Sequence, residues 1–367
     1  MIRGVIMLCT KEKCTGCLSC LNICPKNAIK AITDEQGFWQ MQIDETKCIK
    51  CKLCQKSCPA LFKPNITDLV SKVYACWHKD KAKRQQAASG GLFTALMQNA
   101  LKHNYFVCGA TLTSDMQVKH IIIDKIEDYK LLVGSKYVQS NLSDTFKQIR
   151  ALLLKGNKVL FSGTPCQVSG LYTFLKKRYE NQLFTVDLLC HGVPSPEIFK
   201  KYIAHMEQLY DDKLINFQFR HKPGWRRYQV ILEFTSGKQD ITYKDTSPYI
   251  RGFLKGNFLR PSCYDCDYTS LKRYSDLTIG DFWNYFADNS TDIDDDKGIS
   301  FMLINNENGK ALFDLAKDDL FYLAKDFNRS TSTSPRLHKP TKKPATYEQF
   351  WQDYNNKDFE NIIKEYF

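Results

Sequence analysis

The chain has 367 residues, 43% of them hydrophobic, which is enough for more than one small domain. No run of about 18 apolar residues occurs, so we predict no membrane span. The apolar patch before Cys9 is too short for a secretory signal, and we expect a cytoplasmic protein. The net charge is +12, but the lysines are dispersed and no nucleic-acid-binding motif occurs, so we expect no nucleic-acid partner.

Two identical cysteine runs occupy the first 58 residues. Each has the spacing Cys-x2-Cys-x2-Cys-x3-Cys followed by proline; the runs are Cys14, Cys17, Cys20, Cys24 and Cys48, Cys51, Cys54, Cys58. This spacing is typical of ferredoxins with two 4Fe-4S clusters, in which the last cysteine of each run ligates the other cluster. We therefore predict that Cys58 completes the first site and Cys24 the second. Zinc and disulfides fit this pattern poorly, because zinc sites have longer gaps and disulfides need a secreted context.

Strands and helices alternate after a linker at 63–65. Strands are expected at 73–77, 105–112, 120–123, 158–162, 184–189, 215–220 and 228–234. Helices are expected at 90–101, 143–154, 166–177 and 196–210, with Ser89 and Ser143 as caps. Neither a Gly-x-Gly-x-x-Gly nor a Gly-x4-Gly-Lys-Ser/Thr motif occurs, so an ordinary dinucleotide fold or P-loop is not indicated.

This alternation predicts a fold class of α+β or α/β. We expect a small two-cluster ferredoxin domain at 1–66, followed by a larger mixed α/β domain at 67–346 with parts at about 70–150 and 155–330. Aromatic and aliphatic residues at near-helical spacing predict one docking helix over 347–367.

Two charged segments interrupt the larger domain. Residues 328–346 contain five basic residues and no acid, and we interpret them as a surface loop suited to an acidic partner. Residues 292–296 are rich in aspartate. A calcium loop would need a glutamate where Leu303 stands, so we interpret this segment as a solvated loop.

Seven further cysteines lie outside the two runs. Cys9, Cys76 and Cys108 are predicted to be small buried apolar residues. The other four lie in turns: Cys166, Cys190, Cys263 and Cys266. The first two follow predicted strands, where ligands gather in α/β sheets, and the Cys-x2-Cys pair could complete a four-thiolate site. The pattern leaves open a zinc site, a third iron–sulfur cluster or scattered structural cysteines, and the neighbouring ferredoxin favours iron.

Six short motifs occur in order, and together they are specific. They are Ala-Ser-Gly-Gly at 88–91, Gly-Ser-Lys-Tyr-Val-Gln-Ser at 134–140, Gly-Thr-Pro-Cys-Gln at 163–167, Cys-His-Gly at 190–192, Cys-x2-Cys at 263–266 and Ile-Gly-Asp-Phe-Trp at 279–283. Through them the chain resembles the coenzyme F420 (deazaflavin) hydrogenase/dehydrogenase beta-subunit family over about residues 10–345.

The resemblance implies FAD and a third 4Fe-4S cluster beside it, on Cys166, Cys190, Cys263 and Cys266. It places these residues near the flavin: Ser89, Gly90, Gly91, Lys136, Tyr137, Gly163 and Thr164. Glycines at a helix N-terminus suit a phosphate, with a plain cap as the alternative. Lys136 would stabilise negative charge on a reduced flavin. His191 is either a proton donor or a hydrogen-bonded turn residue, and Asp281 is equally ambiguous.

We therefore predict an oxidoreductase that passes electrons between a one-electron donor, 4Fe-4S clusters, FAD and an organic substrate. The donor would be a ferredoxin or a hydrogenase/dehydrogenase subunit, and the substrate the deazaflavin coenzyme or another reducible small molecule. Two alternatives remain: an electron-transfer subunit without its own substrate site, and an iron–sulfur redox sensor.

Overall fold

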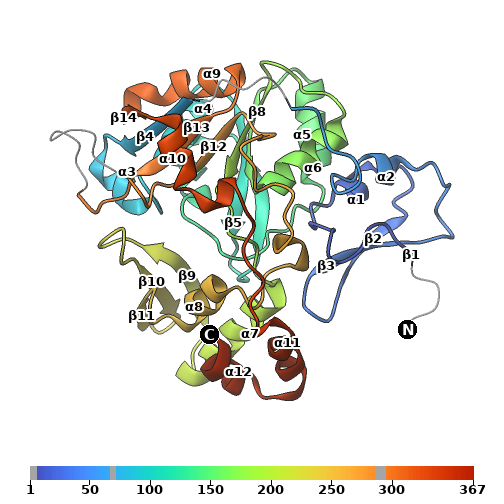
Figure 1. Ribbon diagram of the computed structural model, residues 1–367, viewed down its shortest axis with the longest axis vertical. Helices are drawn as coiled ribbons and strands as arrows, with labels where there is room; N and C mark the ends of the chain where they lie inside the picture. Colours follow the sequence, from blue (N-terminus) through green and yellow to red (C-terminus); the bar gives the residue numbers. More distant parts are fainter. Residues whose placement is uncertain (1–5, 67–71, 286–294) are drawn as a thin grey trace.

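The computed structural model describes residues 6–66, 72–285 and 295–367. Its N-terminal region pairs three antiparallel strands in the order β1-β3-β2, and two short helices flank them (Figure 1). The bounds are β1 Ile6–Met7, α1 Ser19–Ile23, β2 Ile29–Thr33, β3 Trp39–Ile43 and α2 Leu53–Lys56. Each helix begins after a residue with a left-handed backbone, Leu18 or Lys52, because the chain turns sharply inside each cysteine run.

A mixed eight-stranded sheet forms the centre of the larger part, in the order β14-β4-β13-β12-β8-β7-β5-β6. Strands β5, β7, β8 and β12 are parallel to one another, and the other pairings are antiparallel. The bounds are β4 Lys72–His78, β5 Phe106–Leu112, β6 Val118–Ile123, β7 Val159–Gly163, β8 Leu183–Leu188, β12 Leu277–Asp281, β13 Ser300–Ile304 and β14 Leu320–Lys325.

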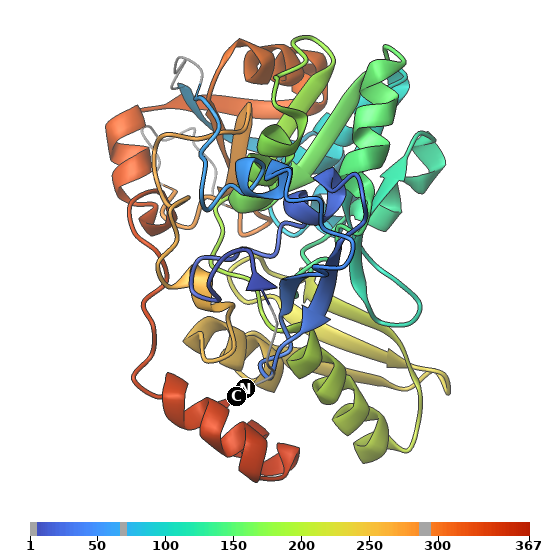
Figure 2. The same ribbon diagram turned by 90° about the vertical axis from the view of Figure 1, so that its right-hand side faces the viewer.

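Helices cover both faces of this sheet (Figure 1). One core packs α4 Leu92–Lys102 and α9 Glu307–Ala316 against it, and another packs α5 Thr145–Leu154 and α6 Pro165–Leu175. The second core also includes Leu18 and Met41 of the N-terminal region. The N-terminal region therefore lies beside α5 and α6, as both ribbon views show (Figures 1 and 2).

A smaller sheet and the C-terminal helices build a separate core. The sheet has the order β11-β10-β9, with bounds β9 Leu214–His221, β10 Gln229–Phe234 and β11 Gln239–Tyr243. Helices α7 Pro196–Tyr210, α8 Pro248–Lys255, α11 Tyr347–Asn356 and α12 Phe359–Tyr366 pack with it. Two short helices remain, α3 Lys81–Gln86 and α10 Phe327–Ser332. Within the described residues, no helix is both long and apolar enough to cross a membrane.

The predicted fold class is confirmed: a mixed α/β part with a large sheet follows a small ferredoxin-like region. All seven predicted strands are present within two residues of their expected bounds. The two predicted caps are wrong. Gly91 precedes α4, whereas the Ser89 hydroxyl donates to the Ile299 carbonyl, and Asp144 precedes α5, whereas Ser143 lies in the turn before it.

The prediction of one helix over 347–367 is also wrong. The chain becomes extended at Lys357 between α11 and α12, which lets both helices return their apolar sides to one core. Phe350 of α11 and Ile362 of α12 are fully buried there.

Candidate functional site

One large cavity has a volume of about 530 Å³. It lies at the carboxyl ends of the parallel strands, where Gly163 ends β7, Leu188 ends β8 and Asp281 ends β12, and all three line it. Ligands bind at this edge of α/β sheets, and the volume falls within the range of cofactor sites. This large cavity therefore lies where the parallel topology places a binding site.

Most residues predicted to contact a flavin line this cavity. They are Ser89, Gly91, Lys136, Tyr137, Gly163 and Thr164, and His191, the candidate proton donor, lines it as well. Gly90 instead packs against the sheet, where its N–H donates to the Ser300 hydroxyl at 3.0 Å. A Cβ atom on Gly90 would lie 2.4 Å from the Cys76 carbonyl oxygen, so this position requires glycine for packing.

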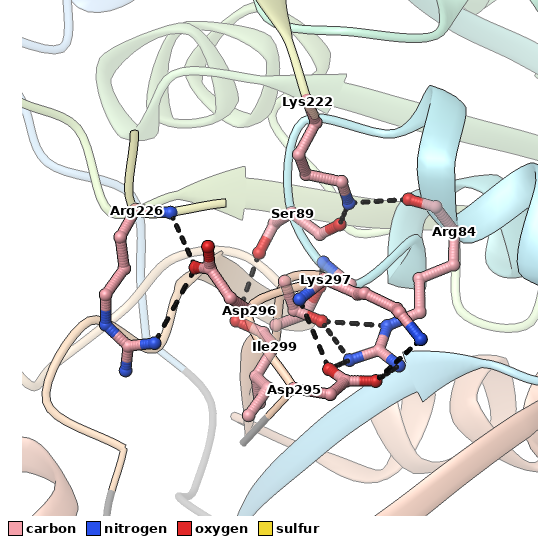
Figure 3. Close-up of polar contacts among 11 residues, drawn as sticks. Arg84, Ser89, Lys222, Arg226, Asp295, Asp296, Lys297 and Ile299 are labelled. Atoms are coloured by element: carbon pink, nitrogen blue, oxygen red, sulfur yellow. Dashed lines mark hydrogen bonds and ion pairs between the residues drawn. The ribbon is translucent and has the colours of Figure 1, made fainter. Parts of the chain in front are cut away.

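A polar cluster holds the loop at 88–91 in place (Figure 3). Lys222 is only 2% exposed, and its amine donates hydrogen bonds to the carbonyls of Arg84 and Ser89. Burial, followed by the neighbouring Arg84 charge, lowers the pKa of Lys222 to about 7. The cavity-lining loop is thereby tied to the chain segment that follows β9.

Arg84 in turn forms hydrogen bonds with the segment before β13. Its guanidinium makes two hydrogen bonds of 2.8 and 2.9 Å to Asp295 and two to the Gly298 carbonyl (Figure 3). Asp296 accepts from the backbone N–H of Arg226 at 2.9 Å. The interpretation of 292–296 as a solvated loop is therefore wrong for its last two residues, which are held in polar contacts, and its first three lie outside the described residues.

Lys136 and His191 both have lowered pKa values. Burial lowers the pKa of Lys136 to about 7, and its amine donates to the Val133 carbonyl at 2.9 Å. Burial and the charge of Arg336 lower the pKa of His191 to about 4, which leaves the imidazole neutral at neutral pH. The His191 ring packs edge-on against Phe253 at 5.0 Å.

An aromatic and ionic wall closes another side of the cavity. Arg220 pairs with Asp281 at 2.6 Å and lies 4.6 Å from the ring centre of Tyr228. Trp225 donates to Asp281 at 2.8 Å and stacks on Trp283 with ring centres 4.7 Å apart. Sequence reasoning noted the motif that contains Asp281, but no local pattern marked Arg220, which comes from the smaller sheet.

Sequence reasoning also missed Arg336. This residue lines the cavity and donates to the Thr341 hydroxyl at 2.8 Å, and that hydroxyl donates to the His191 carbonyl. The prediction of a surface loop over 328–346 is wrong, because Ser330 and Leu337 are buried and draw the segment, including α10, onto the molecule.

Four cysteines gather beside the cavity, and Cys190 also lines it. The group is Cys166, Cys190, Cys263 and Cys266. Burial raises the pKa of each thiol, and the charges of the other three further raise the pKa of Cys190. Buried thiols of this kind form thiolates when a bound metal supplies positive charge. The chemistry of this group therefore fits a metal–sulfur centre.

Two small cavities in the N-terminal region collect the eight cysteines of the runs. One, of about 30 Å³, is lined by Cys24, Cys48, Cys51 and Cys54. The other, of about 20 Å³, is lined by Cys14, Cys17, Cys20 and Cys58. Each set thus combines three cysteines of one run with the last cysteine of the other. No three His, Cys, Asp or Glu side chains in the described ranges lie close enough to hold a single metal ion.

Cys9 also lines the second of these cavities and is only partly buried, so its prediction as a buried apolar residue is wrong. Cys9 follows β1 closely in the chain, and β1 pairs with β3. Cys76 and Cys108 are fully buried within β4 and β5.

The cysteine groups follow one another toward the large cavity. Burial is the main cause that raises the pKa of Cys20 and of Cys17, and a thiol of the neighbouring group adds to each shift: Cys54 for Cys20 and Cys166 for Cys17. Helix α6 makes the second junction, since a Cβ atom on Gly170 would lie 2.8 Å from the Cys17 sulfur. Because Cys190 lines the large cavity, the groups form a continuous series from the N-terminal region to it.

Comparison with known families now identifies the chain. The sequence profiles described as coenzyme F420 hydrogenase/dehydrogenase, beta subunit N-term and C terminus, match residues 73–147 and 156–329, and a 4Fe-4S dicluster domain matches 13–61. The chain belongs to the coenzyme F420 hydrogenase/dehydrogenase beta-subunit family. The resemblance predicted from its motifs is confirmed, and this family member is an iron–sulfur electron-transfer protein of the F420 hydrogenase/dehydrogenase type.

The chain is also similar to two known proteins. An uncharacterized ferredoxin of Methanocaldococcus jannaschii is 36% identical over 56 residues, which are 15% of this family member and 71% of that ferredoxin. A chain of the F420-reducing NiFe hydrogenase complex from Methanosarcina barkeri aligns with a TM-score of 0.46 and 19% identity, over 70% of this chain and 83% of that one.

Proposed function

We propose that the chain is an FAD- and iron–sulfur-dependent oxidoreductase that exchanges electrons between a one-electron carrier protein and an organic substrate. One observation carries this proposal: Cys190 belongs to the group of four neighbouring cysteines and also lines the 530 Å³ cavity. A metal–sulfur centre held there would lie beside any ligand in the cavity, which is the arrangement that electron exchange with an organic cofactor requires.

The proposed ligands of three 4Fe-4S clusters are the cysteines of the three groups. They are Cys14, Cys17, Cys20 and Cys58; Cys24, Cys48, Cys51 and Cys54; and Cys166, Cys190, Cys263 and Cys266. When bound, such clusters carry one electron each, and a flavin supplies the link between one-electron and hydride chemistry.

The cavity offers suitable groups for a flavin. Gly91, which precedes the N-terminus of α4, and the loop at 88–91 suit a phosphate, whose charge the exposed N–H groups of the helix would accommodate. Lys136 lies at the lining with a pKa of about 7, so it can accept a proton when negative charge develops beside it. His191 is neutral, which favours a role as a positioning or hydrogen-bonding group over that of a cationic acid.

The substrate class follows from the family and stays a proposal. The reducible molecule would be the deazaflavin coenzyme or another flat redox compound, bound over the flavin near the wall that contains Arg220 and Trp283. The carrier protein would be a ferredoxin or a hydrogenase/dehydrogenase subunit, as expected from the relatives of the chain.

Anaerobic purification followed by iron, sulfide and flavin analysis tests the proposal. About twelve irons per chain, from three cubes of four, and one FAD are expected. About eight irons without flavin would contradict it. The purified chain should then oxidise or reduce deazaflavin without other subunits; full cofactor loading without this activity would favour an electron-transfer subunit that lacks a substrate site. Clusters without flavin or turnover would favour a redox sensor.

A further inference from the structure

The cavity lined by Cys24, Cys48, Cys51 and Cys54, the second cysteine group, is bounded in part by residues that are exposed to solvent. Pro25, Lys26, Ile49 and Lys52 line this cavity and are themselves exposed to solvent. Cys51, which also lines it, is the one exposed cysteine among those of the described residues. A group held in this cavity would therefore lie close to the protein surface.

The other two cysteine groups contain no exposed cysteine. Cys17, Cys20 and Cys58 are buried, and burial raises the pKa of each cysteine in the group beside the large cavity. Because the rate of electron transfer falls steeply with distance, a carrier protein on the outside would exchange electrons most readily through the second group. The series of cysteine groups thus begins at this surface and ends at the large cavity.

This surface is basic with an apolar centre. Five exposed lysines surround the second run: Lys26, Lys47, Lys50, Lys52 and Lys56. None of them forms an ion pair with another described residue, so their charge is available to a partner. Ile49 in their midst is 58% exposed, and Asp44 and Glu45 are the acids of the same stretch. We call these five lysines and Ile49 the lysine face.

We propose that the lysine face is the docking surface for an acidic one-electron carrier protein. This inference rests on the proposed assignment of a cluster to Cys24, Cys48, Cys51 and Cys54. The carrier is oxidised as it gives up one electron, and the chain is reduced as it accepts that electron. The same transfer can run in reverse. Charge complementarity steers the two proteins together and makes the encounter sensitive to salt, while Ile49 supplies apolar contact at the centre.

This proposal moves the docking surface away from 328–346. The basic residues of that segment do not form one free surface, since Arg336 lines the cavity and Lys343 pairs with Glu348 at 2.6 Å. Lys339 and Lys342 are exposed there, and they provide a matched control of equal charge.

The experiment measures the affinity of the anaerobically purified chain for an acidic two-cluster ferredoxin, by biolayer interferometry at low and high salt. Two double variants are compared with wild type: Lys26→Glu with Lys52→Glu, and Lys47→Glu with Lys56→Glu. Each is expected to weaken binding at least about tenfold and to reduce its salt dependence. The second pair does not line the cavity, so iron content in that variant should equal the wild-type value.

The Lys339→Glu, Lys342→Glu variant is expected to bind like wild type, and basic cytochrome c is expected not to bind. Wild-type affinity in both lysine-face variants, or an equal loss in the control variant, would overturn the proposal. Iron and flavin contents are measured on the same samples. If about twelve irons are present and the lysine-face variants still bind like wild type, the docking proposal fails. If fewer irons are present, the cluster assignment fails instead.

Discussion

The N-terminal region and the sheet part gather their cysteines in opposite ways. In the N-terminal region, two runs of eleven residues each supply three cysteines to one cavity and the fourth to the other, and few large apolar side chains are buried. Beside the large cavity, Cys166 is the second residue of α6, Cys190 follows β8, and the other two come before β12 in the chain. The first arrangement is local in sequence, and the second exists only because a sheet brings distant segments together.

This contrast indicates that the N-terminal region depends on metal for its fold more than the sheet part does. A short region with a small core gains much of its stability from the groups it binds, whereas an eight-stranded sheet with two covered faces is stabilised by burial of apolar surface. Removal of metal should therefore destabilise the N-terminal region more than the sheet part.

Complete removal of metal should have the largest effect. After anaerobic chelation and reduction, residues 6–66 should lose protection from amide hydrogen exchange, whereas β7 and β8 should keep it, because their residues are buried between helices. Mass spectrometry of the exchanged peptides checks this. Equal loss of protection in both regions would show that the sheet also depends on metal.

Substitution of one sheet-part cysteine should have a more limited effect. Cys190→Ala should lower the iron content by about four per chain. The two N-terminal sites should stay filled, because their ligands come from other segments of the chain. Cys76→Ala is the matched control, because Cys76 is fully buried but lies within β4 away from the group. The assignment of Cys190 as a ligand would be wrong if both variants kept the wild-type iron content.

The junction between the two regions is tested at Gly170. An added methyl group in Gly170→Ala would lie 2.8 Å from the Cys17 sulfur and 2.9 Å from its Cβ atom, both in a buried contact. Overpacking of this kind costs about 1–3 kcal/mol, and it should also lower occupancy of the adjoining cluster site. Gly109→Ala is the control, because its nearest neighbour is a flexible Leu132 methyl at 3.3 Å. Thermal unfolding and iron content of both variants separate strain at the junction from a general loss of stability.

The sequence predicted the local features of both regions well. Cysteine spacing anticipated which four cysteines share each N-terminal cavity, and buried apolar runs such as β7 located the parallel strands. Helix α7 has the predicted bounds, because Ser195 caps it and Pro196 begins it.

Features that depend on long-range packing were not predictable. Ser89 has the chemistry of a helix cap, but its hydroxyl instead donates to Ile299, which lies 210 residues away. Arg336 sits in a segment with the composition of a surface loop, and only the burial of Leu337 brings it to the cavity. Arg220 shows the same limit, since its partner Asp281 belongs to the other sheet.

The last prediction concerns buried charge, which again distinguishes the two regions. The lysines around the second cysteine run are exposed, whereas Lys222 is 2% exposed with a pKa of about 7. An unfolded lysine has a pKa near 10.4, so between about pH 7 and 10 the unfolded chain binds more protons at this residue than the folded chain does. The unfolding free energy should therefore rise with pH in that window, by up to about 1.4 kcal/mol per pH unit from this group.

Lys222→Met should remove this contribution, so that its midpoint of thermal unfolding gains less than that of wild type between pH 7 and 9. The control is Lys310→Met on the exposed side of α9, which should keep the wild-type slope. Lys136 also has a pKa of about 7 and adds a second contribution, which the Lys222 variant retains. Parallel pH profiles for wild type and Lys222→Met would mean that the amine stays protonated in the folded protein, held by the carbonyls of Arg84 and Ser89.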